Sequence, residues 1–115
     1  MTIKNAKIRS VQLGFEDHGI LTCRLNLDYG GSAQGFGGYG FSHRPRGDKD
    51  IGSADFADYI IGILRTLEVD SWENLPGKSL RVEVESFSGP IKRIGHFLKD
   101  RWFDPQDAIG KRKVA

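Results

Sequence analysis

The side chains of this sequence that could perform catalysis are few, and they do not occur in catalytic spacings. The three histidines, His18, His43 and His96, show no His-x-x-His or carboxylate spacing that would gather metal ligands. The single cysteine, Cys23, falls at an apolar position of an expected strand, so a small buried hydrophobe is expected there. A serine or cysteine nucleophile needs a base within reach and an oxyanion hole, and no Gly-x-Ser-x-Gly motif offers one. We therefore expect a binding protein without enzymatic activity, metal or cofactor.

A glycine-rich segment, residues 30–40, is one candidate for ligand contact. Residues 35–40 match the pattern G-x-G-x-x-G, and backbone N–H groups in such a turn can bind phosphate. The segment, however, follows an expected hairpin instead of opening a helix, and it has no Walker lysine. Interior glycines usually mark a bulge or the close approach of another backbone or a ligand, and the glycines alone favour a twisted strand that lets a partner subunit approach closely.

Arginines and aromatic residues follow this segment and occur again near the end of the chain. Guanidinium groups pair with phosphates and stack on rings, so this combination suits a nucleotide. The two aromatic residues near the end could equally anchor a strand or form a dimer contact. The candidate residues are Arg44, Arg46, Arg93, Arg101, Trp102 and Phe103.

Charge and hydropathy restrict the class of partner. Lys111, Arg112 and Lys113 against Asp107 account for the net charge of +2, so the rest of the chain is neutral overall. A duplex-binding surface would need basic residues spread over the fold, so nucleic acid is not the expected partner. No apolar run approaches the roughly 20 residues that span a bilayer, and no signal peptide is visible. A cytoplasmic protein without a membrane partner is expected.

Hydrophobic periodicity predicts an α+β domain with an antiparallel sheet of about five strands, β-β-β-α-β-β, and one amphipathic helix packed on it. Residues 1–105 are expected to form this single domain, and residues 106–115 a basic, flexible tail. The expected strands are 4–15, about 20–29, the glycine-rich segment, about 80–85 and 91–102. The helix is expected over 54–68, where apolar residues recur at i, i+3, i+4, i+7 and i+8.

Strand faces follow from alternation. In the first strand Ile8 has the opposite parity to the apolar residues after it, which predicts a bulge near Arg9. In the second strand the inward residues are expected to be Leu21, Cys23, Leu25, Leu27 and Tyr29, and in the fourth Leu80, Val82 and Val84. In the fifth they are Ile94, His96 and Leu98. Residues 70–73 resemble a capping box that opens a one-turn helix.

Four segments together resemble a known family. They are Leu13-Gly14-Phe15-Glu16-Asp17-His18-Gly19-Ile20-Leu21, Gln34-Gly35-Phe36-Gly37-Gly38-Tyr39, Ile94-Gly95-His96 and Asp100-Arg101-Trp102-Phe103. The chain is similar over nearly its whole length to small phage and prophage proteins, and in particular to the Thoeris anti-defence sponges of the first type.

The resemblance implies a phage protein in the host bacterial cytoplasm that captures cyclic ADP-ribose isomers from TIR-domain immune enzymes and does not cleave them. It also implies a homo-oligomer, a dimer or a hexamer, in which some members carry further sites for cyclic oligonucleotides. Arginines and an aromatic residue at a subunit interface bind the ligand, for which the candidates here are Arg93, Arg101, Phe103 and Phe36.

Two other functions remain open from the sequence. A protein that inhibits a host defence complex by direct binding could use the loop 41–50, which contains Arg44 and Arg46. A single-strand nucleic-acid module could use Phe36, Tyr39 and Trp102, although the neutral body argues against it.

Overall fold

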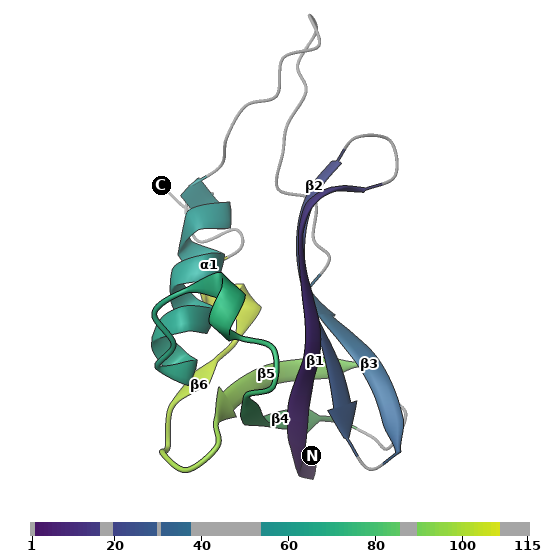
Figure 1. The fold of residues 1–115 in the computed structure, drawn as a ribbon. Coiled ribbons are helices and arrows are strands. Elements are labelled where there is room, and N and C mark those ends of the chain that lie inside the picture. The colour runs from purple at the N-terminus through teal and green to yellow at the C-terminus, as the bar shows by residue number, and fades with distance from the viewer. Residues whose placement is uncertain (1, 17–19, 30, 38–53, 86–89, 109–115) are drawn as a thin grey trace, which may run out of the picture.

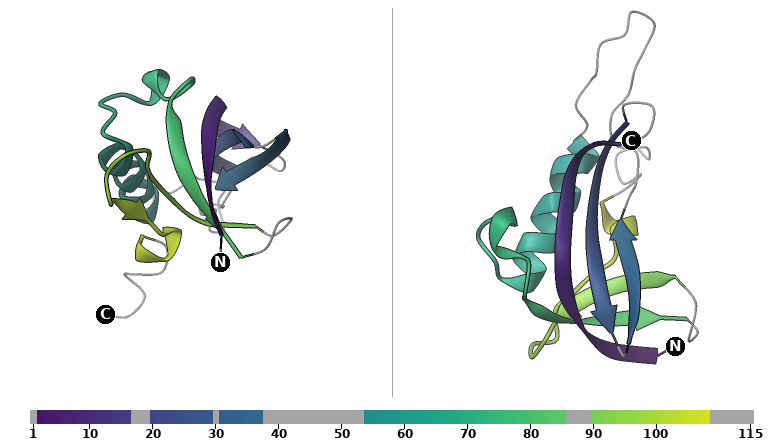
Figure 2. Two further views of the ribbon diagram at one scale, coloured as in Figure 1. Left: turned by 90° about the horizontal axis from the view of Figure 1, so that it is seen from below. Right: turned by 45° about the vertical axis from the view of Figure 1, so that its right-hand side comes forward.

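Six strands form one antiparallel sheet in the order β3-β2-β1-β4-β5-β6. The computed structural model describes residues 2–16, 20–29, 31–37, 54–85 and 90–108. The strands are β1 (Thr2–Glu16), β2 (Ile20–Tyr29), β3 (Ser32–Gly37), β4 (Ser79–Val84), β5 (Ile91–His96) and β6 (Trp102–Phe103). The helices are α1 (Ala54–Leu67) and two 3₁₀ helices, η2 (Trp72–Asn74) and η3 (Pro105–Asp107). The predicted α+β class is confirmed, with α1 on one side of the sheet (Figures 1 and 2).

The long strand β1 joins two halves of the sheet. Its first half pairs with β4 and its second half with β2, and the register shifts between Ile8 and Ser10. Ile8 lies opposite Leu27, and Val11 lies opposite Leu25. The partners are two residues apart whereas Ile8 and Val11 are three apart, so one extra residue must bulge for both to face the core. The predicted bulge is confirmed. The strands β4 and β5, on the side of the first half of β1, cross the direction of β2 and β3 (Figure 1).

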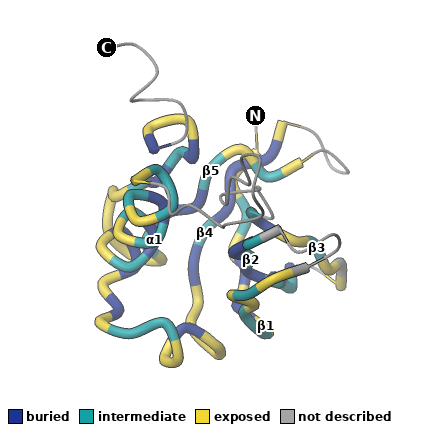
Figure 3. The backbone as a smooth tube through the Cα atoms, turned by 90° about the horizontal axis from the view of Figure 1, so that it is seen from above, coloured by how far each residue is buried: buried dark blue, intermediate teal, exposed yellow. Residues whose placement is uncertain are grey.

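The core lies between α1 and the concave face of this bent sheet, and buried stretches of strands and helix gather around it (Figure 3). The ring of Tyr59 in α1 is at its centre. It stacks on Phe36 of β3 with centroids 6.2 Å apart and meets Phe103 of β6 edge-on at 5.5 Å. Since β3 and β6 are the two edges of the sheet, one helical residue links both edges.

The helix and the second and fourth strands follow the predicted patterns. The helix ends one residue before the predicted boundary, and it buries Tyr59, Ile63 and Leu67. The predicted inward faces of β2 and β4 are buried, apart from Leu21, which is half-buried. The expected one-turn helix is the 3₁₀ helix η2, and Ser71 Oγ donates to the side chain of Glu73 instead of capping the backbone.

The last expected strand is in fact two strands. β5 stops at His96, whose Nδ1 accepts hydrogen bonds of 3.0 Å from the backbone N–H groups of both Leu98 and Lys99. This turn reverses the chain into β6, so the prediction of one strand over 91–102 was wrong. Leu98, expected to face inward, is 82% exposed. The fold also continues past residue 105, because Ala108 is buried in the core.

None of the helices in the described ranges is long and apolar enough to cross a membrane.

Candidate functional site

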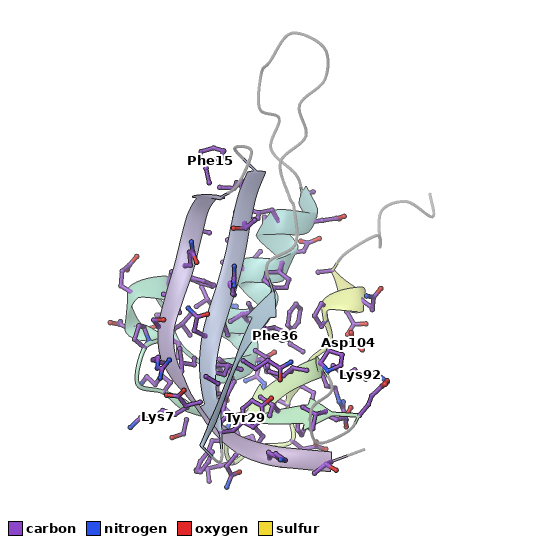
Figure 4. The ribbon with its side chains drawn as sticks, turned by 90° about the vertical axis from the view of Figure 1, so that its right-hand side faces the viewer. Lys7, Phe15, Tyr29, Phe36, Lys92 and Asp104 are labelled. Carbon is purple, nitrogen blue, oxygen red and sulfur yellow. The ribbon has the colours of Figure 1, made fainter. Side chains whose placement is uncertain are left out.

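The two aromatic residues predicted to contact a ligand lie in the core. Phe36 is 2% exposed and Phe103 is 6% exposed, and both rings contact Tyr59. Figure 4 shows Phe36 directed from β3 towards the interior. The structure brings the two rings close to the same helical residue, but in this conformation they hold the sheet edges together and leave almost no surface for a ligand.

Glycines of β3 are explained by contacts within the chain. Gly37 has φ +104°, and a Cβ there would lie 2.5 Å from the carbonyl oxygen of Cys23 and would also meet Tyr59 Oη. A Cβ on Gly35 would lie 2.9 Å from Cδ of Arg24. The predicted close approach of another backbone therefore occurs at Gly37, and that backbone belongs to the neighbouring strand β2.

Arg93 lies on the outer face of β5 and is held by partners within the chain. Its Nε and Nη2 donate to the two carboxylate oxygens of Glu83 at 2.9 and 3.0 Å. Its Cζ lies 4.5 Å from the centroid of the Trp102 ring. The hydrogen bonds from Arg93 lower the pKa of the Glu83 carboxyl against an opposing effect of desolvation. The bidentate geometry that suits a phosphate is thus used here on a carboxylate.

Trp102 completes this outer face. Arg81, Gly95 and Trp102 lie in register on three neighbouring strands. A Cβ on Gly95 would lie 2.5 Å from Cε3 of Trp102, so the indole ring needs a glycine beside it. Arg81 Cζ is 4.8 Å from the ring centroid, and its Nε and Nη2 donate to the carbonyl oxygens of His96 and Lys99 at 2.8 and 2.7 Å. These contacts hold the turn between β5 and β6 in place.

Arg101 has a different partner from Arg93, the residue that follows α1. Its Nη1 donates to Oε2 of Glu68 at 2.9 Å. Lys99 Nζ contacts both oxygens of the same carboxylate at 2.9 and 2.8 Å, and His96 Nε2 lies 3.8 Å from Oε2. We call Lys99 and Arg101, together with the imidazole of His96, the cation cluster. The hydrogen bond from Lys99, followed by that from Arg101, lowers the pKa of the Glu68 carboxyl against desolvation.

A groove of about 630 Å³ lies beside the cation cluster, at the C-terminal half of α1. We call it the α1 groove. Ile61 in its wall is 54% exposed and gives the groove an apolar surface. Arg65 projects from the last turn of α1, and no carboxylate pairs with it within the described ranges. The lining residues are Ile61, Leu64, Arg65, Glu68, Val69, Asp70 and Arg101.

This groove combines apolar wall, guanidinium groups and carboxylates, which is the composition of a site for a small polar ligand. Arg101 was predicted from sequence. Arg65, Glu68, Lys99 and His96 were missed as site residues. The run from His96 to Arg101 carries an imidazole and two positive side chains within six residues. This spacing could have indicated an anion site from the sequence, whereas no neighbouring residue indicates that Glu68 is their partner.

Several predicted site residues lie outside the described ranges: Arg44, Arg46, the loop 41–50 that contains them, and Tyr39. His18 and His43 also lie outside them. Within the part of the chain that the structure describes, no three His, Cys, Asp or Glu side chains come together as a metal site would require.

Comparison of the chain with models of protein families, with curated proteins and with solved structures finds no match.

Proposed function

We propose that this chain is a phage protein that sequesters a cyclic nucleotide immune signal, a cyclic ADP-ribose isomer, without cleaving it. Cyclic oligonucleotides are proposed as further ligands. The family resemblance suggests the ligand, and the α1 groove supports a place for it. The observation that carries the proposal is that an arginine without a carboxylate partner in the described ranges, Arg65, shares the groove with Arg101 and exposed Ile61.

The chemistry of the groove matches the parts of such a ligand. The phosphates need positive donors in a fork geometry, which Arg65 and Arg101 supply. The base and ribose rings need apolar surface, which Ile61 and Leu64 offer. Of the four residues that the resemblance implies, Arg101 keeps a direct role, Arg93 holds the turn through Trp102, and Phe36 and Phe103 support the fold.

Sequestration sets a quantitative requirement. Each site removes one ligand molecule, so the protein must be abundant and must bind with an affinity near the concentration of the signal. We propose that it acts in the host cytoplasm as a homo-oligomer, a dimer or a hexamer, in which a neighbouring copy covers the ligand.

Calorimetric titration of the full chain with cyclic ADP-ribose isomers tests this function. Arg65→Ala should weaken binding about tenfold or more, because a charge-assisted hydrogen bond contributes roughly 1.5–3 kcal/mol. Arg9→Ala is the matched control, since Arg9 lies on β1 and pairs with Asp28 away from the groove. The ligand should be recovered intact after release. Folded protein that shows no binding heat with any isomer would contradict the function, and equal binding by Arg65→Ala would contradict the groove.

The exposed turn between β5 and β6 favours a second function, inhibition of a host defence complex by direct protein binding. Leu98 is 82% exposed and Phe97 is also exposed beside it. Apolar side chains of this size at a turn are common contact points in protein interfaces. If this function holds, Leu98→Asp abolishes co-purification with a host protein, whereas Arg65→Ala leaves it unchanged.

A further inference from the structure

All three side chains of the cation cluster lie around one carboxylate, that of Glu68. Lys99 contacts both of its oxygens, Arg101 contacts Oε2 at 2.9 Å, and His96 Nε2 lies 3.8 Å from Oε2. The groups are partly open to solvent: the side chains of Glu68, Lys99 and Arg101 are 34%, 60% and 46% exposed. Each ion pair this exposed contributes little to stability by itself, although several charges on one carboxylate act as a network.

The backbone at Glu68 disfavours the residue that stands there. The N–H of Val69 donates to the carbonyl of Leu64 at 3.0 Å and the N–H of Glu68 to that of Arg65 at 3.4 Å, which is the Schellman arrangement. Glu68 occupies its left-handed position with φ 56°, where glycine or asparagine is normal. A negative side chain at the C-terminus of a helix also meets the negative end of the helix dipole. Two local effects therefore oppose a glutamate that the cation cluster nevertheless contacts.

The backbone of the turn that carries the cation cluster is held by hydrogen bonds that do not involve Glu68. His96 Nδ1 accepts from the backbone N–H groups of Leu98 and Lys99, so the ring proton is on Nε2, which faces the carboxylate. The N–H of His96 donates to the carbonyl of Arg101 at 2.9 Å, and Arg81 binds two carbonyls of the turn. The turn thus fixes the backbone from which the three donors extend, and their side chains meet at the Glu68 carboxylate, where an oxyanion would contact the same groups.

We propose that His96, Lys99 and Arg101 form an oxyanion subsite for a phosphate group, which the Glu68 carboxylate occupies in the free protein and leaves when phosphate binds. The subsite opens on the α1 groove, because Glu68 and Arg101 are part of its lining. That the phosphate belongs to a nucleotide rests on the proposed function; the exchange of Glu68 for phosphate does not.

Exchange is favourable on charge and on geometry. A phosphate group offers three acceptor oxygens and up to two negative charges to the three donors, whereas the carboxylate offers two oxygens and one charge. An ordinary glutamate is already ionised at neutral pH, and the hydrogen bonds that lower the pKa of Glu68 extend this range to lower pH, so its carboxylate competes with phosphate under both conditions.

Calorimetric titration of the full chain with inorganic pyrophosphate tests the subsite. Glu68→Gln keeps the shape of the side chain and removes the competing charge, so it should bind pyrophosphate about three- to tenfold more tightly than the wild type. Glu68→Gly should show the same gain in affinity, and glycine readily adopts the φ of 56° at this position. It replaces the glutamine variant in the experiment if that variant folds poorly. Adding Lys99→Ala to either variant should reverse the gain.

Asp70→Asn is the matched control, because Asp70 lines the same groove and has no ion pair in the described ranges. It should change pyrophosphate affinity less than about twofold.

The proposal is overturned if both Glu68 variants fold and bind pyrophosphate no more tightly than Asp70→Asn does. A gain with pyrophosphate but no binding of cyclic ADP-ribose isomers removes the proposed function and leaves the subsite. Binding of those isomers that neither Glu68→Gln nor Lys99→Ala alters overturns the subsite and leaves the function.

Discussion

The packing of β6 on α1 makes Gly62→Ala a decisive substitution. Gly62 lies in the middle of α1, where replacing glycine by alanine normally stabilises a helix by about 1 kcal/mol. In this fold an alanine Cβ would lie 2.5 Å from Cδ1 of Phe103 and closer still to Cε1, whereas ordinary contacts are 3.4–4 Å. Helix propensity and tertiary packing therefore predict opposite signs for the change in stability.

The packing effect should be the larger one. The Phe103 ring cannot simply withdraw, because it is 6% exposed and its other neighbour, the Tyr59 ring, is 5.5 Å away between centroids. Overpacking of a core costs about 1–3 kcal/mol, which exceeds the gain in helix propensity over most of that range. We expect net destabilisation of about 1 kcal/mol, and a decrease in Tm of about 4 °C.

Urea unfolding followed by circular dichroism measures this change, and a double-mutant cycle assigns its cause. Phe103→Val removes the ring atoms that the new Cβ would meet, so in that background Gly62→Ala should stabilise the protein by about 0.5–1 kcal/mol. If Gly62→Ala alone stabilises the wild type by the full helix-propensity value, Phe103 does not pack on α1 and the position of β6 is wrong.

One further substitution and one labelling experiment test other parts of the structure. Arg93 lowers the pKa of Glu83 from 4.5, so the pair stabilises the fold above that pH and the contribution is lost as the pH falls through the lowered value. The urea midpoint of Glu83→Gln should therefore fall less steeply between pH 5 and 3 than that of the wild type, and equal slopes would refute the pairing. Burial raises the pKa of Cys23 to about 12, so iodoacetamide at pH 8 should leave the native thiol unmodified and label it in urea. Labelling of the native protein within minutes would instead show that β2 opens locally.

Local periodicity was sufficient to predict the helix and most of the strands. The alternation in β2 and the 3.6-residue period of α1 depend on which side chains avoid water, and this can be read from neighbouring positions. The bulge near Arg9 was predictable for the same reason, because the parity of Ile8 conflicts with that of Val11 unless a residue is added. The neutral body and the few groups with catalytic potential were likewise evident from the sequence.

Contacts between distant segments decided the rest. The break after His96 depends on its imidazole binding two backbone N–H groups, which alternation cannot show. Phe36 and Phe103 were predicted as ligand contacts. They lie on opposite edges of the bent sheet, and its curvature brings both rings against Tyr59 in the core.

The site itself depended on tertiary structure. Arg101 was a candidate from its residue type, yet its partner Glu68 lies 33 positions earlier in the sequence. A short-range pattern contains no information on a pairing made by packing α1 against the turn between β5 and β6. The sequence by itself determined the helix, most of the strands and one residue of the site, Arg101. Only the tertiary structure decided where β5 ends and which side chains meet at Glu68, because those contacts join segments far apart in the chain.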